Sequence, residues 1–120
     1  MPHDVLTAYT RSRISETARV LHRAADLIDH LGLAKGTLWD GDQLCTLQAL
    51  WTGATGRLDA NEVHHSAEFE KAACFVRDKL EAAGFYVYGA RFSTICSWNN
   101  RDESTQERVV RTLRLLAEVA

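Results

Sequence analysis

A cysteine, a pair of histidines and an asparagine are the residues of this sequence that best suit nucleophilic chemistry. Cys45 falls near the start of an expected helix, a position that lowers a thiol pKa and favours the thiolate. His64 or His65 can then supply a base that Asn99 orients, as in a Cys-His-Asn triad. The alternative interpretation is that Cys45 is a small buried residue of the core. Spacing does not separate the two, because such triads are assembled in space.

The cysteines Cys45 and Cys96 and the histidines His64 and His65 are of the types that bind zinc. The sequence has no C-x-x-C pair and no pair of histidines at metal-binding spacing. His64 and His65 are adjacent, and adjacent side chains on a helix or strand point apart. We therefore expect no metal and no other cofactor, with Cys45, His64, His65 and Cys96 as the weak candidate ligands.

Two tryptophans and two asparagines are candidates for a ligand pocket. Trp39 lies in an expected loop over residues 33–42, and Trp98 begins the polar run Trp98-Asn99-Asn100-Arg101-Asp102. Trp98 can act as a stacking wall, with Asn99 and Asn100 beside it. The alternative is that both tryptophans anchor their loops on the core, while the polar side chains make local turns.

Two apolar residues fall outside the buried stripes of their helices and are candidates for a partner interface. Phe75 is flanked by Lys71 and Lys79, and Leu115 lies among arginines of the last helix, which include Arg108 and Arg111. Apolar residues in such places suit contact with another protein or with a second copy of the chain.

Basic residues gather around the first helix and along the last one. They are Arg11, Arg13, Arg19, His22 and Arg23, and then Arg101, Arg108, Arg111 and Arg114. If the two helices adjoin, these residues form a basic face that suits phosphate or an acidic protein. The alternative is a solvated face that nearby acidic residues balance.

Apolar periodicity predicts four helices that position these groups. They run over residues 12–31, 42–51 and 66–83, and from a capping box at Ser104 and Glu107 along an apolar stripe to Ala117. Ser12 or Ser15 caps the first helix, and Gly32 ends it; Asp42 caps the second and Ser66 the third. The aromatic and β-branched stretch 85–98 allows a short β-hairpin between the third and fourth helices. The expected class is mainly α, a compact bundle of about four helices.

Length and composition favour one globular domain over residues 1–120. The chain has 120 residues, 46% of them hydrophobic, and a net charge of −2. This composition excludes a disordered chain, and it excludes a protein that binds nucleic acid through bulk charge. No signal peptide or membrane-spanning stretch is evident, so we expect a cytoplasmic protein that does not associate with a membrane. Neither a P-loop, a dinucleotide fingerprint nor a G-x-S-x-G motif is found.

Several short motifs resemble those of a family of small uncharacterised proteins from actinobacteria and their phages. They are the opening run LHRAADLI from Leu21 to Ile28, Cys45 before Ala49-Leu50, Trp98-Asn99-Asn100, and Thr105-Gln106-Glu107-Arg108-Val109. The resemblance spans about Leu21 to Leu116. Gln48 stands where the family usually has Gly, and Asn100 where it usually has Asp. The resemblance implies a fold and a source, and no established activity.

The sequence thus supports three hypotheses of function. The first is a small non-catalytic helical protein that binds a protein partner or itself, as a homodimer or a regulator, through Phe75 and Leu115. The second is a small enzyme or accessory protein with a thiol- or metal-dependent pocket around Cys45, His64 and Trp98. The third is a phage-type inhibitor of a host complex that uses the arginine face.

Overall fold

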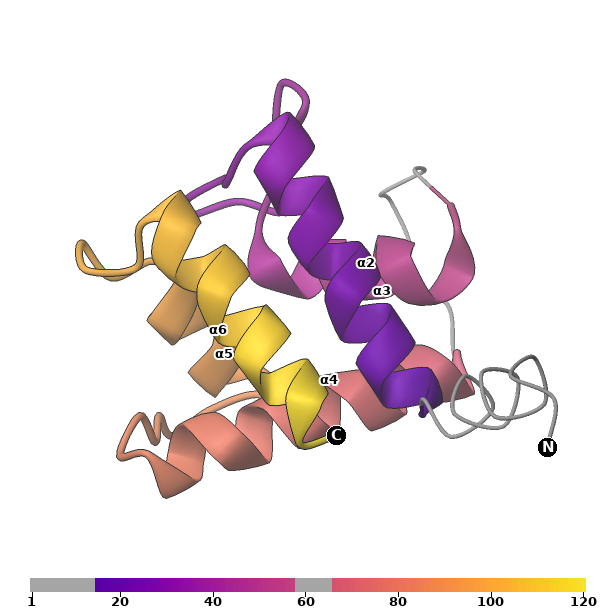
Figure 1. Ribbon diagram of the computed structural model, residues 1–120. Helices are drawn as coiled ribbons and strands as arrows, with labels where there is room; N and C mark the ends of the chain where they lie inside the picture. Colours follow the sequence, from indigo (N-terminus) through magenta and orange to yellow (C-terminus); the bar gives the residue numbers. More distant parts are fainter. Residues whose placement is uncertain (1–14, 58–65) are drawn as a thin grey trace, which may run out of the picture.

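The protein is a bundle of helices with one very small sheet, as a computed structural model shows (Figure 1). The structure describes residues 15–57 and 66–120. In those ranges it has five helices and two strands: α2 (Glu16–Leu31), β1 (Trp39–Asp40), β2 (Gln43–Leu44), α3 (Thr46–Thr55), α4 (Ala67–Ala82), α5 (Ser93–Asn99) and α6 (Gln106–Glu118). The prediction of a mainly α fold is confirmed.

Helix α2 is the centre of the bundle, because α3, α4 and α6 all pack against it. Figure 1 shows α6 running beside α2, with α4 crossing near the lower end of both. The buried face of α2 includes Leu21, Ala24 and Ile28, which are fully buried. A β-carbon at Gly53 of α3 would lie 3.0 Å from the carbonyl oxygen of Val20, so glycine permits the close approach of these two helices.

The predicted signals at the ends of α2 and at the start of α4 are confirmed. Ser15 Oγ accepts a hydrogen bond from the Ala18 amide at 3.0 Å, and Ser66 Oγ accepts one from the Phe69 amide at 3.2 Å. Gly32 follows α2 with φ of 99°, a value that favours glycine. These serines satisfy amides that the first turn of a helix leaves without a backbone partner.

The predicted starts of two other helices are wrong by one to a few residues. Helix α3 begins at Thr46 with Cys45 as its cap, because Asp42 is used in the turn of the β1–β2 hairpin. Thr105, rather than Ser104, caps α6 by accepting from the Arg108 amide at 3.3 Å. Ser104 is instead buried and donates to the Trp98 carbonyl oxygen at 2.5 Å.

The expected hairpin between the third and fourth helices is also wrong. The hairpin of the structure lies at residues 39–44, across the end of the expected loop and the start of the expected second helix, and pairs Trp39 with Leu44. Residues 93–99 form α5 in place of a strand. Thr94, Ile95, Trp98 and Asn99 are buried there, which is the spacing of one helix face. Packing of this face against α3 and α4 outweighs the strand preference of Thr94 and Ile95.

Candidate functional site

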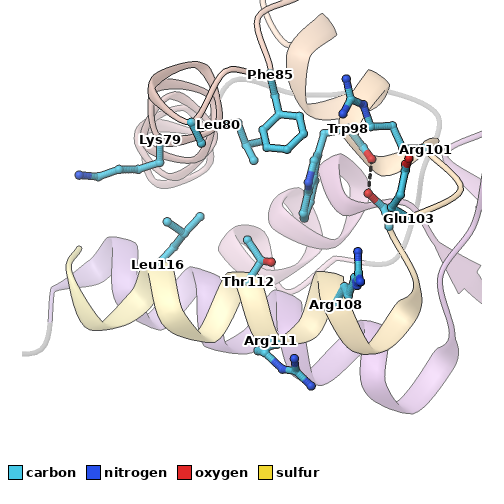
Figure 2. Close-up of a pocket in the computed structure, with 12 residues that line it drawn as sticks. Lys79, Leu80, Phe85, Trp98, Arg101, Glu103, Arg108, Arg111, Thr112 and Leu116 are labelled. Carbon is cyan, nitrogen blue, oxygen red and sulfur yellow. Dashed lines mark hydrogen bonds between the residues drawn. The ribbon is translucent and has the colours of Figure 1, made fainter.

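A groove of 680 Å³ lies between the end of α4, the segment that follows it, α5 and α6 (Figure 2). Its floor is apolar and aromatic: Leu80 comes from α4, Phe85 from the segment after α4, Trp98 from α5 and Leu116 from α6. In Figure 2 the rings of Phe85 and Trp98 lie next to each other, and Thr112 and Leu116 point into the cavity from α6. The volume is within the range of about 300–1,000 Å³ that is usual for ligand-binding clefts.

The wall of the groove next to Trp98 is held in place by Lys35. Its ammonium group donates to the carbonyl oxygens of Asn99 at 2.5 Å, Arg101 at 2.7 Å and Ser104 at 2.6 Å. These carbonyls belong to the end of α5 and to the turn that leads into α6. One side chain from the loop after α2 therefore fixes the connection between the two helices that supply Trp98 and Leu116.

The rim of the groove is rich in cations. Its charged lining residues are Lys79, Arg101, Arg108 and Arg111, against the single carboxylate of Glu103. The Arg101 guanidinium lies over the Phe85 ring, 4.6 Å from its centroid, which is a cation–π geometry. In Figure 2 Arg108 rises from α6 toward Trp98, whereas Lys79 and Arg111 extend away from the cavity.

The arginines on α6 differ in whether they already have an acidic partner. Arg114 forms an ion pair with Asp26 of α2 at 2.7 Å. Within residues 15–57 and 66–120, neither Arg108 nor Arg111 has an ion-pair partner, so their charges are available to a ligand. The basic residues of α2 and α6 are thus brought near each other by the packing of the two helices, but part of that face is already neutralised.

Of the two apolar interface candidates, Leu115 is the accessible one. Its exposed fraction is 55%, and it lies on α6 between Arg111 and Val119, which is 64% exposed. Phe75 is half-buried, packs against the hydrophobic core and has the Lys79 ammonium 5.6 Å from its ring centroid. The groove and the exposed side of α6 therefore contain Leu115, Arg108 and Arg111, whereas Phe75 is largely used inside the protein.

Some of the candidate thiol and pocket residues lie together, in a cavity separate from the groove. Cys45, Cys96, Asn99 and Asn100 line a second, smaller cavity of 210 Å³, together with residues 36–38. Trp98 lines the larger groove, and Trp39 packs against the core and lines neither cavity. His64 and His65 lie outside the residues that the structure describes, as do Arg11 and Arg13.

Asn99 is engaged in hydrogen bonds that join three segments of the chain. Its Oδ1 accepts from the Thr46 amide at 2.8 Å and from the Thr46 hydroxyl at 2.6 Å. Its Nδ2 donates to the Ala34 carbonyl oxygen at 2.9 Å and to Asn100 Oδ1 at 3.0 Å. Asn100 Oδ1 also accepts from the Gly36 amide at 2.8 Å. Asn99 is 1% exposed, and its hydrogen bonds connect α5, the start of α3 and the loop after α2.

The expected activation of Cys45 is wrong in direction. Cys45 does cap a helix, since its Sγ accepts from the Gln48 amide at 3.4 Å. Burial nevertheless raises the pKa of the Cys45 thiol, and burial also raises the pKa of Cys96. The loss of hydration outweighs the helix amides because the side chain is nearly enclosed, with 6% exposed. The structure therefore favours the protonated thiol at both positions.

A metal centre has no support in the part of the chain that the structure describes. No group of three or more His, Cys, Asp or Glu side chains is placed there to hold a metal ion. Cys45 and Cys96 share a cavity, but no third ligand of these types joins them among the described residues.

Sequence reasoning did not indicate several residues that line the groove, among them Lys79, Leu80, Phe85 and Glu103, nor Lys35, which holds its wall. Phe85 carried a signal, since it began an aromatic run, but that run was assigned to a strand. Lys35 carried none, because a lysine in a polar loop gives no indication of a contact 64 to 69 residues further along the chain.

The fold and the groove define a mainly α-helical protein with a cation-rimmed, apolar surface groove. The chain belongs to DUF6197, a family of unknown function whose model matches residues 13–119. This confirms the expectation of an uncharacterised family, while the actinobacterial and phage origin stays a prediction. No curated protein and no solved structure matches the chain. Within the described ranges, no helix is both long and apolar enough to cross a membrane.

Proposed function

We propose that this protein is a non-catalytic binding protein that recognises a protein partner through the groove and the adjoining exposed side of α6. The observation that carries the proposal is the combination of an apolar floor with arginines that have no ion-pair partner in the described residues. Aromatic residues and arginine are enriched where proteins bind each other, because aromatic rings bury a large apolar area and one guanidinium group can donate several hydrogen bonds.

The exposed Leu115 and Val119 support a macromolecular partner. They continue the accessible surface along α6 beyond the end of the cavity. A partner that covers the groove together with Leu115 and Val119 removes their apolar surface from water. This burial favours formation of the complex.

Another hollow, separate from the groove and from the cavity at Cys45, fits a binding role less well. It has a volume of 420 Å³, and the loop residues Tyr86 and Tyr88 line it with Arg77 and Arg91. Here the arginines already form ion pairs, Arg77 with Asp78 and Arg91 with Glu70, both at 3.0 Å. A charged partner would have to displace these carboxylates, whereas Arg108 and Arg111 require no such exchange.

An enzymatic function that depends on a thiolate has weaker support. Cys45 and Cys96 line the same cavity, but burial favours their protonated forms. Asn99, the residue that would orient a base, uses its amide to connect Thr46 and Ala34.

Affinity purification from the cells that produce the protein tests the proposal. We expect the double variant Arg108→Glu/Arg111→Glu to lose a partner that the wild-type protein retains, since reversing two charges replaces attraction by repulsion. The matched control is Arg19→Glu/Lys71→Glu, which reverses two exposed cations that do not line the groove. Equal recovery of every partner by wild type and by the groove variant would contradict the proposal.

A further inference from the structure

We propose that the groove binds an acidic, amphipathic segment of the partner protein, with an apolar side chain of the segment in the cavity and its carboxylates against the arginines of the rim. This inference rests on the proposed function and specifies the chemistry of the partner.

The charge of the rim selects an anionic ligand. Four cationic residues and one carboxylate line the groove, in a chain whose net charge is −2. The carboxylate, Glu103, also acts on Lys35: burial lowers the pKa of Lys35, and Asp102 and then Glu103 oppose that shift, so part of the charge of Glu103 acts on a cation outside the rim. Carboxylates at the rim meet guanidinium groups that can donate two hydrogen bonds to one acid group. A basic segment would meet like charges.

The apolar floor selects a ligand that also has an apolar side chain. Leu80 and Trp98 are buried below the rim, and Phe85 and Leu116 are half-buried beside them. A small inorganic anion would occupy the rim and leave this floor in contact with water. A bulky apolar side chain that enters the cavity removes the floor from water, and it lies close to the aromatic rings of Phe85 and Trp98.

The extent of the surface selects a chain segment rather than a small molecule. Arg108, Arg111, Leu115 and Val119 recur at intervals of three or four residues, so they share one side of α6. This stripe of exposed residues covers about 16 Å at 1.5 Å per residue. Its cationic part is toward the N-terminus of α6 and its apolar part toward the C-terminus. The acidic residues of the bound segment should therefore lie at the N-terminal end of α6.

Peptide selection against the folded full chain tests the inference without knowledge of the natural partner. A displayed library of random peptides is selected on immobilised wild-type protein, after removal of the peptides that bind the Arg108→Glu/Arg111→Glu variant. We expect the enriched peptides to combine Asp or Glu with Trp, Phe or Leu. Enrichment of basic or uncharged peptides, or none at all, would overturn the inference.

Titration of an enriched synthetic peptide then tests the position and the charge pairing. Amide resonances of α6 and of residues 80–85 should shift, and affinity should fall about tenfold or more for Arg108→Glu/Arg111→Glu. The Arg19→Glu/Lys71→Glu control should bind as the wild type does. A peptide with Lys in place of its acidic residues should regain affinity for the groove variant. Unchanged affinity in the groove variant would overturn the inference, as would shifts confined to another surface.

The inference and the proposed function fail in different ways. If a natural partner is lost by the groove variant but contacts the groove with a basic or neutral surface, the binding function holds and the acidic segment is wrong. If native mass spectrometry shows a dimer of the wild-type chain and a monomer of the Arg108→Glu/Arg111→Glu variant, a second copy occupies the groove and the acidic partner is wrong. If the groove variant loses no partner and the selection enriches no peptide, both the inference and the proposed function are wrong.

Discussion

At the scale of single residues, Asn99 and Cys45, whose side chains suit catalysis, have structural roles in this fold. Asn99 connects Thr46 to Ala34, and Cys45 caps α3 with a thiol that burial keeps protonated. Residues of the same types serve in a catalytic triad where the fold brings them together in the required geometry. The difference lies in their surroundings, which depend on how the loop after α2 meets α5.

The raised pKa of Cys45 predicts a fall in stability at alkaline pH. The folded protein keeps the thiol proton at pH values where the unfolded chain, with a thiol pKa of about 8.5, has lost it. This contribution is therefore present below about pH 8.5 and is lost as the pH rises above it. Urea unfolding at several alkaline pH values should show a smaller loss of stability in Cys45→Ser, whose hydroxyl does not titrate there. Identical pH dependence in the two proteins would refute the assignment.

The buried thiol also predicts an order of alkylation. Cys45 is buried, whereas Cys74 is half-buried and lies on α4 with the Arg91 guanidinium 3.5 Å from its Sγ. Because iodoacetamide reacts with an accessible thiolate, we expect Cys74 to be labelled before Cys45 in the native protein. Peptide mapping by mass spectrometry after timed labelling measures the order. Fast labelling of Cys45 would restore the case for a reactive thiol.

Lys35 should contribute to stability although it is exposed. Lys35→Met removes an ammonium that donates to three carbonyl oxygens, and we expect a loss of about 1–2 kcal/mol in the free energy of unfolding. Lys71→Met, at an exposed position of α4 with no such contacts, is the matched control. Equal stability of the two variants would show that the Lys35 contacts are not formed in solution.

At the scale of elements, the sequence predicted helices where periodicity and caps agree, as at α2 and α4. It missed α5, because Thr94, Ile95 and Trp98 give these seven residues a local preference for a strand, and only packing against α3 and α4 selects the helix. The site was predicted in pieces. Trp98, Arg108, Arg111 and Leu115 were named as candidates, but their assembly depends on where α5 and α6 lie relative to α4. Local sequence does not determine that arrangement.

The close approach of α2 and α3 makes a prediction at the same scale. Gly53→Ala places a β-carbon 3.0 Å from the Val20 carbonyl oxygen and 3.2 Å from the Ala24 amide nitrogen, so one helix must move. We expect a loss of about 1–3 kcal/mol in the free energy of unfolding, although alanine alone favours a helix over glycine. Urea denaturation measures it. A stabilised variant would show that the two helices are further apart than described.

At the scale of the whole molecule, charge is distributed unevenly. The net charge of −2 gives no indication of a basic site, yet the rim of the groove has four cations and one carboxylate. Arg114, on the same helix, is neutralised by Asp26, whereas Arg108 and Arg111 have no such partner among the described residues. A protein of this composition can therefore bind an acidic partner through one surface while the rest of the molecule remains acidic overall. The groove and the adjoining side of α6 form the surface through which we propose that this member of DUF6197 binds a partner.

Photo-crosslinking from inside the groove, in the cells that make the protein, tests this claim most directly. A photoreactive amino acid replaces Thr112, which points into the cavity, and in a control protein it replaces Ala67 at the start of α4. Ala67 is twelve residues before Lys79 and thus about 18 Å away along the helix. We predict a defined adduct with another protein from position 112 that is absent from position 67 and is lost when Arg108→Glu and Arg111→Glu are added. No adduct from position 112, or the same adducts from both positions, would contradict the claim that the groove is a binding surface.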